Sequence, residues 1–345
     1  MANKIVYEYL PLKFKKYSVS FINNNFPTIK EDLGKFSWKK VLYYIKQYKL
    51  YKIFRHDVLY LTPGQTFFGV IKYFPFIGLA VLLRKHIIIH IHGNYVHQAY
   101  INLSVLRKKI YHFILSQAHK GIVLSPTLKK NLTPFLANDS INILYNFVED
   151  YLFDIDIKKK INTNFSFLKI IFLSNLMEEK GIFDFVEALN ILKKNNISFS
   201  ATVAGGIDSK LQYQILKRFS ELDNYISYLG IASGEEKKKI LIDANVFVFP
   251  TFYKMEGQPI VILEAMATGN IIMTTKHAGI PDIFIENKNG FYIKKQSPYD
   301  IAEKLILLSE NLSNYKYIAL NNHLEAKRKY NLDKFISNLH EIIEK

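Results

Sequence analysis

The second half of the chain alternates short apolar runs with segments of helical periodicity. The runs end in glycine, proline or polar residues and predict strands at 168–173, 199–204, 225–229, 246–249 and 271–274. The segments between them predict helices at 183–192, 211–222, 235–243 and about 259–268. This rhythm predicts an α/β domain with a parallel, doubly wound sheet, in which ligands bind at the carboxyl ends of the strands.

The first half repeats this rhythm less regularly. Strand patterns occur at 18–22, 58–61, 87–91 and 121–124, and helical patterns at 38–52, 68–83 and 103–116. The polar stretch 145–165 predicts the join between two domains. We therefore expect domains at 1–150 and 166–330, a linker at 151–165, and a C-terminal stretch at 331–345 whose amphipathic helix could pack back on the first domain.

Basic side chains are concentrated in the first half. Residues 1–150 hold 21 Lys and Arg against 7 Asp and Glu, whereas residues 151–345 hold 25 against 23. The first half should therefore attract an anionic partner, which can be a phospholipid surface, a pyrophosphate-linked acceptor or nucleic acid. The alternative explanation is a general lysine bias of the source proteome, but such a bias would make the second half of the chain basic as well. The chain has no cysteine, which excludes disulfides and Cys-ligated metals, and no signal-peptide pattern at its start.

One predicted helix, 38–52, has the pattern of a helix that lies on a membrane surface. An apolar face with aromatics is bordered by lysines; the residues are Trp38, Val41, Leu42, Ile45 and Tyr48, with Lys39, Lys40 and Lys46 off that face. The alternative is a domain helix with its apolar face on the sheet, which is the commoner situation. The apolar stretch 70–83 is shorter than the roughly 20 residues of a membrane span and contains Pro75, so we predict no transmembrane segment.

Two carboxylates, Glu256 and Glu264, stand eight residues apart around the start of a predicted helix. Pro259 suits the first helical turn, where its missing N–H is not needed. The free backbone N–H groups near Gln258 and Ile260 would then form an anion site. Glu264 can accept hydrogen bonds from two ribose hydroxyls, and Glu256 from a transferred sugar, with a diphosphate between them. The plain alternative is two solvent-exposed glutamates.

The surrounding motifs resemble the nucleotide-sugar-binding domain of the retaining glycosyltransferases of family 4, which have the GT-B fold. The resemblance covers residues 168–294 and rests on five elements: 249–269 with its Glu-Gly-Gln-Pro and Glu-Ala-Met-Ala-Thr-Gly, 278–282, the Lys-Gly loop 174–181, Leu229-Gly230-Ile231, and Asn287 with Gly290-Phe291. It implies two Rossmann-like doubly wound domains facing a cleft, the first on the acceptor side and the second for the nucleotide sugar.

The resemblance also implies roles for individual residues. Lys180 would bind the diphosphate, and Asn175 stands where the family has an arginine. Ile231 would pack on the base. The residues themselves suggest that Gly205, at a strand end, lines the phosphates or forms a simple turn. Gly257, Gln258, Pro259 and Ile260 would complete the donor site.

In the first half, His92-Gly93 matches the His-Gly at the cleft edge, so His92 would lie near the sugar and the β-phosphate. Leu144-Tyr145-Asn146 resembles the junction that precedes the second domain. The family opens with a glycine-rich loop, but Gly34 is the only glycine in residues 1–37. The first domain is therefore expected to be abbreviated at its start.

Together these features imply a metal-independent, retaining glycosyltransferase without a cofactor. It would move a sugar from a nucleotide-sugar donor, most often a UDP-sugar in this family, to a glycan or lipid-linked acceptor. The setting would be bacterial surface polysaccharide or glycolipid synthesis, with a cytoplasmic protein held at an anionic membrane surface. A catalytically impaired partner that only binds the nucleotide sugar is the alternative, and a nucleic-acid binder rests on charge alone.

Two other patterns have some features of metal sites. His90 and His92 have an i, i+2 spacing and would need a third ligand such as His97. Asp154-Ile155-Asp156 looks like the D-x-D of metal-dependent glycosyltransferases, but it does not follow a strand. Local hydrogen bonding and a solvated linker are the better interpretations, so no metal is expected.

Overall fold

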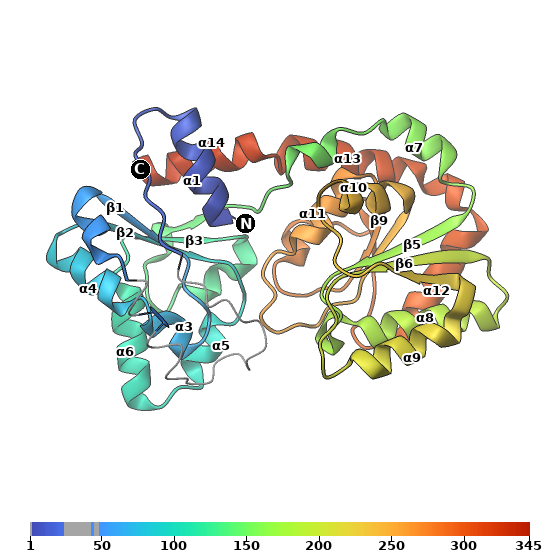
Figure 1. The fold of residues 1–345 in the computed structure, drawn as a ribbon, viewed down its shortest axis with the longest axis horizontal. Coiled ribbons are helices and arrows are strands. Elements are labelled where there is room, and N and C mark those ends of the chain that lie inside the picture. Colours follow the sequence, from blue (N-terminus) through green and yellow to red (C-terminus); the bar gives the residue numbers. More distant parts are fainter. Residues whose placement is uncertain (1, 24–42, 45–47) are drawn as a thin grey trace. The chain divides into compact units, whose positions relative to one another are not determined.

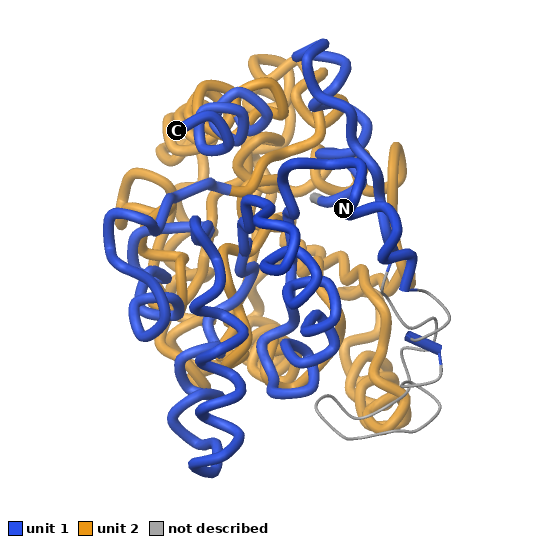
Figure 2. The backbone as a smooth tube through the Cα atoms, turned by 90° about the vertical axis from the view of Figure 1, so that its left-hand side faces the viewer, with its two compact units in different colours: residues 1–145, 335–345 blue, residues 146–334 orange. Residues whose placement is uncertain are grey.

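A computed structural model describes residues 2–23, 43–44 and 48–345. The chain forms two compact units (Figure 2): unit 1 is Met1–Tyr145 with Phe335–Lys345, and unit 2 is Asn146–Lys334. The predicted membrane-facing residues Trp38, Lys39, Lys40 and Lys46 lie outside the described residues.

Unit 2 is built on a six-stranded parallel sheet of order β10-β9-β8-β5-β6-β7. Its strands are β5 (Leu168–Leu173), β6 (Phe199–Ala204), β7 (Ile226–Tyr228), β8 (Val246–Phe249), β9 (Ile271–Thr274) and β10 (Gly290–Tyr292). All side chains of β8 and β9 are buried, because helices cover both faces of the sheet. This two-sided burial is why the strands appear in the sequence as unbroken apolar runs.

The helices of unit 2 divide between the two faces of this sheet (Figure 1). One face carries α8 (Ile182–Lys194), α9 (Gln212–Leu222) and α12 (Pro298–Glu310). The other carries α7 (Ile157–Thr163), α10 (Gly234–Asp243), α11 (Ile260–Ala267) and α13 (Lys316–Lys329). From β5 the chain first adds β6 and β7 on one side and then β8, β9 and β10 on the other. The direction of winding therefore reverses between β5 and β8, which is the switch point where such sheets bind ligands.

Unit 1 has a four-stranded parallel sheet of order β1-β2-β3-β4. The strands are β1 (Val58–Leu61), β2 (His86–Ile91), β3 (Lys120–Val123) and β4 (Ile141–Ile143). In Figure 1, α3 (Phe67–Ile71), α4 (Phe74–Leu82), α5 (Val96–Ile101) and α6 (Val105–Ser116) lie on one side of the sheet. On the other side lie α1 (Ala2–Lys13) and α14 (Leu332–Glu344). The predicted α/β class with two Rossmann-like domains is confirmed. The winding reverses in unit 2, whereas the described strands of unit 1 lie side by side in sequence order.

Two predictions for unit 1 are wrong. The segment 18–22 is not a strand; it runs past β1 without joining the sheet. The stretch 68–83 is two helices instead of one, since α3 ends at Ile71 and α4 begins at Phe74. Pro75 explains this break, because its ring has no N–H for the carbonyl of Ile71 and would collide with that carbonyl in a continuous helix.

The two described ends of the chain pack together in unit 1. The ring of Phe14 stacks on His340 with centroids 3.8 Å apart, and the Lys13 ammonium donates to the Ser337 hydroxyl at 2.7 Å. The Tyr17 hydroxyl donates to the Glu344 carboxylate at 2.6 Å. The helix α14 thus supplies part of unit 1 although unit 2 precedes it in the sequence.

The stretch 151–165, predicted as a linker, lies inside unit 2 and contains α7. Asp156 caps this helix by accepting from the N–H of Lys159 at 2.9 Å. Lys160 is only 3% exposed and donates to the carbonyls of Leu241 (2.9 Å) and Thr268 (2.6 Å), with Asn270 as a third acceptor. Burial holds the pKa of Lys160 well below its usual value. The Lys158-Lys159-Lys160 run therefore anchors α7 through one lysine.

We expect Lys160→Met to lower the free energy of unfolding of unit 2 by about 2 to 4 kcal/mol. The substitution leaves buried carbonyl acceptors without a donor, and each such group costs roughly 1–3 kcal/mol. Urea denaturation followed by circular dichroism measures the change. Lys158→Met, at an exposed position of the same helix, is the matched control and should change stability by less than about 0.5 kcal/mol. Equal effects of the two variants would contradict the anchoring role.

Candidate active site

Lys180 and Glu256 meet at the switch point of unit 2. Lys180 ends the loop that follows β5, and Glu256 lies in the loop that follows β8. The Lys180 Nζ is 2.6 Å from the Glu256 Oε2, and the Thr251 hydroxyl donates to the same oxygen at 3.3 Å. Both side chains are largely buried, with 14% and 10% of their surface exposed. The sequence assigned them to different parts of a ligand; the structure pairs them directly.

The two loops are locked together by backbone contacts. Gly181 has a φ of +83°, and a Cβ at this position would approach Pro250 to 2.5 Å. The N–H of Phe252 donates to the carbonyl of Glu179 at 2.9 Å. The Lys180 ammonium also lies 4.8 Å from the ring centroid of Tyr253, a cation–π distance. A glycine after Lys180 is thus required for the ammonium to be presented at this place.

Asn175, Gly205 and Ile231 come from three neighbouring strand ends. The N–H of Gly205 donates to the carbonyl of Gly230 at 2.6 Å, and a Cβ on Gly205, whose φ is +143°, would collide with the Ser174 carbonyl. The three loops are therefore in contact. Asn175 is exposed, and 77% of the Ile231 side chain faces solvent. The structure thus brings a polar amide and an unusually exposed apolar side chain to one edge of the sheet.

Glu264 lies in the middle of α11 and is only 3% exposed. Its Oε1 is 2.6 Å from the Nζ of Lys237 on α10, and Glu149 lies 3.9 Å from the same ammonium. Burial raises the pKa of Glu264 above its usual value, and the ammonium of Lys237 offsets only part of this increase. Burial alone would lower the pKa of Lys237. The contacts with Glu264 and Tyr151 have a larger, opposite effect, so the pKa of Lys237 is raised above its usual value. The raised pKa of Lys237 and the 2.6 Å contact favour an ion pair between the two side chains.

Lys237 was not predicted as part of the site. It belongs to the run Glu235-Glu236-Lys237-Lys238-Lys239, which has the composition of a solvated helix face. Only its position in α10, opposite α11, distinguishes it from its neighbours. The sequence carries no local signal for a partner 27 residues away.

The predicted helix start needs a correction. Pro259 is the N-cap residue with an extended ψ of 118°, so α11 begins at Ile260 and not at the proline. Gln258 is buried, and its Oε1 accepts from the N–H of Asn146 at 2.6 Å. The Asn146 amide donates in return to the Gln258 carbonyl at 2.8 Å. Gln258 therefore holds the first residue of unit 2, Asn146, against the loop. The carbonyl of Gly257 accepts a hydrogen bond from the N–H of Gly279 at 2.9 Å.

In unit 1, His90 and His92 stack at the carboxyl end of β2. Their ring centroids are 4.0 Å apart, and the Tyr60 hydroxyl contacts His90 Nδ1 at 2.5 Å. Burial lowers the pKa of His90 well below its usual value, and that of the partly exposed His92 to about 4. Both imidazoles are therefore neutral near pH 7. His97 does not join them, because its Nδ1–H donates to the Lys130 carbonyl at 3.1 Å.

We expect acid to destabilise unit 1 through these two histidines. A histidine in the unfolded chain has a pKa of about 6.5, so the unfolded state binds more protons than the folded state between about pH 6.5 and pH 4. The free energy of unfolding is retained above this window and lost as the pH falls through it, by at most about 1.4 kcal/mol per pH unit for each histidine. Urea unfolding at a series of pH values measures the slope. His90→Asn should reduce the slope, and an unchanged slope would contradict the assignment.

Within the described ranges, no three His, Asp or Glu side chains form a group that could hold a metal ion. Asp154 pairs with Lys238 at 3.4 Å, and Asp156 caps α7. The Asp154-Ile155-Asp156 pattern therefore has structural partners in this chain.

The second half of the chain has a clear relationship to a known family. The sequence profile of the glycosyl transferases group 1 family matches residues 154–323. Residues 154–323 are a glycosyl transferases group 1 domain. This group 1 domain contains the Lys180–Glu256 pair, the Lys237–Glu264 pair, and the loops of Asn175, Gly205 and Ile231.

Two curated proteins illustrate the relationship. The amylovoran biosynthesis glycosyltransferase AmsK of Erwinia amylovora is 26% identical over 211 residues, which are 60% of this chain and 51% of that protein. The N,N'-diacetylbacillosaminyl-diphospho-undecaprenol alpha-1,3-N-acetylgalactosaminyltransferase of Campylobacter jejuni is 26% identical over 142 residues, 41% of this chain and 35% of that protein. The matched parts of the chain thus span about half or less of these relatives.

The fold also matches solved structures. The Anabaena Alr3699/HepE protein in complex with UDP superposes with a TM-score of 0.70 over 86% of this chain and 80% of that chain, at 16% identity. This likeness shows that the chain, with its two Rossmann-like domains, has the GT-B class of fold. In the described part of the chain, no helix is both long enough and apolar enough to cross a membrane.

Proposed function

We propose that the chain is a metal-independent, retaining glycosyltransferase that uses a nucleotide-sugar donor. The observation that carries the proposal is the Lys180–Glu256 pair at the switch point of the group 1 domain. A nucleotide sugar has an anion for the lysine and hydroxyl donors for the glutamate. Binding would exchange one buried ion pair for two matched contacts, with Lys180 on the diphosphate and Glu256 on the sugar.

The nucleoside would extend from this pair toward Glu264 and Ile231. Glu264 is paired with the Lys237 ammonium and can accept hydrogen bonds from the ribose hydroxyls. The exposed Ile231 offers an apolar surface for the base, and Gly205, which lets its loop lie against Ser174, would line the phosphates at the end of β6. Asn175 adds an amide donor at the same edge.

The chemistry requires a stabilised diphosphate leaving group. Lys180 supplies a positive charge, and the N–H groups at the start of α11 near Ile260 supply further donors. The acceptor hydroxyl would attack the anomeric carbon on the face from which the diphosphate leaves, which retains the configuration; the O–H proton passes to the departing phosphate. No metal or cofactor takes part in this scheme. His92, neutral at pH 7, is our candidate for the group that unit 1 supplies to the sugar.

We infer a UDP-sugar as donor and a glycan or lipid-linked acceptor, in bacterial surface polysaccharide or glycolipid synthesis. The structural relative that binds UDP supports the donor. The relatives named for amylovoran and for a diphospho-undecaprenol substrate support the acceptor class. The basic balance of residues 1–150 supports placement at an anionic membrane surface.

A second candidate is a nucleotide-sugar-binding partner of another transferase, without turnover of its own. It is favoured by Asn175, which stands where the family has an arginine and so leaves one charge fewer for the diphosphate. Incubation of the full chain with bacterial membranes and a panel of labelled UDP- and GDP-sugars separates the two candidates. Transfer of label to the glycolipid fraction supports the enzyme, whereas stabilisation by UDP without transfer under any donor supports the binding partner.

A further inference from the structure

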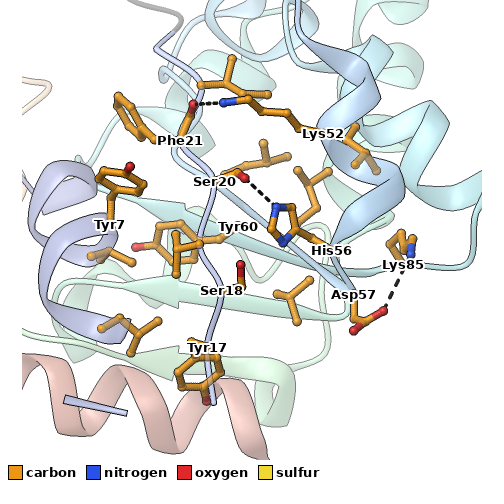
Figure 3. Close-up of a pocket in the computed structure, with 18 of the residues that line it drawn as sticks. Tyr7, Tyr17, Ser18, Ser20, Phe21, Lys52, His56, Asp57, Tyr60 and Lys85 are labelled. Atoms are coloured by element: carbon orange, nitrogen blue, oxygen red, sulfur yellow. Dashed lines mark hydrogen bonds and ion pairs between the residues drawn. The ribbon is translucent and has the colours of Figure 1, made fainter. Parts of the chain in front are cut away.

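Unit 1 contains a cavity that the proposed function does not use. It has a volume of about 470 Å³ and lies between the edge strand β1, the helix α1 and the segment 16–22 (Figure 3). Small-molecule sites have volumes of roughly 300–1,000 Å³, so the space is large enough for a ligand. All its lining residues belong to unit 1.

The walls of this cavity are mainly apolar. They are formed by side chains from β1, α1, α4, the passing segment and the 3₁₀ helix η1 (Leu50–Arg55); among them are Val6, Leu10, Val19, Ile53, Leu59 and Phe76. Such a lining favours a hydrocarbon over a sugar or a nucleotide, whose hydroxyls would lose hydrogen bonds to water on entry.

The outer wall is attached by side chains and not by a strand ladder. In the described part of the chain, β1 pairs with β2 alone. The segment 16–22 is held by His56 Nε2, which is 2.7 Å from the Ser20 hydroxyl, and by Lys52, which donates to the Phe21 carbonyl at 2.9 Å (Figure 3). Because no backbone ladder draws the segment against β1, the space between them stays open.

Cations are in excess at the rim of the cavity. Lys85 lies 3.8 Å from Asp57, which partly balances its charge. The Lys52 ammonium donates to the Phe21 carbonyl, which carries no charge. Arg55 is exposed and forms no ion pair with any described residue. Both positive charges come from η1 and line the cavity. An anionic group would be attracted to this rim.

Exposed apolar side chains lie on η1 and α4, two of the elements that line the cavity. Tyr51 and Phe54 of η1 are 58% and 61% exposed, and Phe74 and Leu82 of α4 are 46% and 78% exposed. Aromatic and aliphatic side chains beside cations are typical of surfaces that contact lipid. A chain leaving a lipid phase could therefore reach the cavity past η1.

We propose that this cavity binds the hydrocarbon chain of a single-chain anionic amphiphile, with its acidic group at Lys52 and Arg55. The apolar lining, the unbalanced cations and the adjacent exposed apolar side chains each point to this chemistry. A fatty acid and an isoprenyl phosphate both combine a hydrocarbon chain with an acidic group, and the experiment below distinguishes them. The inference concerns unit 1 alone and stands whether or not the group 1 domain transfers sugar.

The test is photolabelling of the full chain with two diazirine probes, a photoreactive palmitate and a photoreactive farnesyl phosphate. Peptides are then mapped by mass spectrometry. We expect label on peptides from residues 2–23 and 50–61, with unlabelled probe competing and the neutral alcohol of the same chain competing about tenfold less well. The probe that labels at the lower concentration identifies the acyl or the isoprenoid source.

Three variants make the result specific. Val19→Trp places an indole in the cavity and should reduce labelling about tenfold, whereas Leu106→Trp, at an exposed position on α6, should not. Lys52→Gln with Arg55→Gln should abolish the preference for the anionic probe over the alcohol. Thermal unfolding by circular dichroism checks that each variant is folded. Label spread over other peptides, equal labelling of the Val19→Trp variant, or no preference for the anion would overturn the proposal.

Discussion

Lys180→Met should lower the turnover number for sugar transfer about 100- to 1,000-fold. Loss of one donor that stabilises charge in a transition state costs roughly 2.7–4 kcal/mol, and Lys180 is the only cation that the structure places on Glu256 among the described residues. Its charge is needed most when the diphosphate departs, so the turnover number should fall more than the Michaelis constant rises. Initial rates with a labelled nucleotide sugar measure both quantities.

The matched control for this variant is Lys194→Met. Lys194 is exposed in the last turn of α8 and contributes the same formal charge to the domain. Its substitution should leave the rate within about twofold of the wild type. If both variants behave alike, the effect of Lys180 is one of overall charge, and the assignment to the leaving group is wrong.

Glu264→Ala should weaken UDP binding by about 100-fold or more and also destabilise unit 2. The binding loss follows from two hydrogen bonds to a charged acceptor, each worth roughly 1.5–3 kcal/mol. The stability loss follows from Lys237, which is only 12% exposed on its side chain and would lose the carboxylate 2.6 Å away. Removing one partner of a buried ion pair costs about 3–5 kcal/mol. Calorimetric titration and urea unfolding measure the two effects separately.

A double variant separates binding from folding at this pair. Glu264→Gln with Lys237→Gln removes both charges and so should recover most of the stability lost in Glu264→Ala. It should not recover UDP affinity, because the amide is a weaker acceptor for ribose hydroxyls. Recovery of both properties in the double variant would show that Glu264 acts on the fold alone and has no direct contact with the nucleoside.

The sheet of unit 2 could be predicted because its strands are buried on both faces. Residues 168–173 and 246–249 appear as unbroken apolar runs, and the structure places strands at those same positions. The segment 18–22, Ser-Val-Ser-Phe-Ile, alternates polar and apolar residues as a strand with one buried face would, but it forms no strand. A strand needs a partner ladder as well as a suitable sequence, and this segment contacts its neighbours through Ser20 and the Phe21 carbonyl instead.

Charged residues with buried partners could not be predicted from local pattern. Lys160 and Lys237 both lie in lysine-rich runs that look solvated. Their acceptors are 81 and 27 residues away, at Leu241 and Glu264, and only the packing of helices brings them together. The individual residues Lys180 and Glu256 were found through their motifs. Their direct contact across 76 residues was not, because it depends on the reversal of winding between β5 and β8.

The central claim is that the switch point of the group 1 domain binds a nucleoside diphosphate through Lys180. The most direct measurement is calorimetric titration of the wild type and of Lys180→Met with UDP, GDP and uridine. We predict one UDP site in the wild type, a loss of about tenfold or more in UDP affinity for the variant, and little change for uridine, which carries no phosphate. Absence of binding by either diphosphate, or equal UDP affinity of the two proteins, would contradict the account.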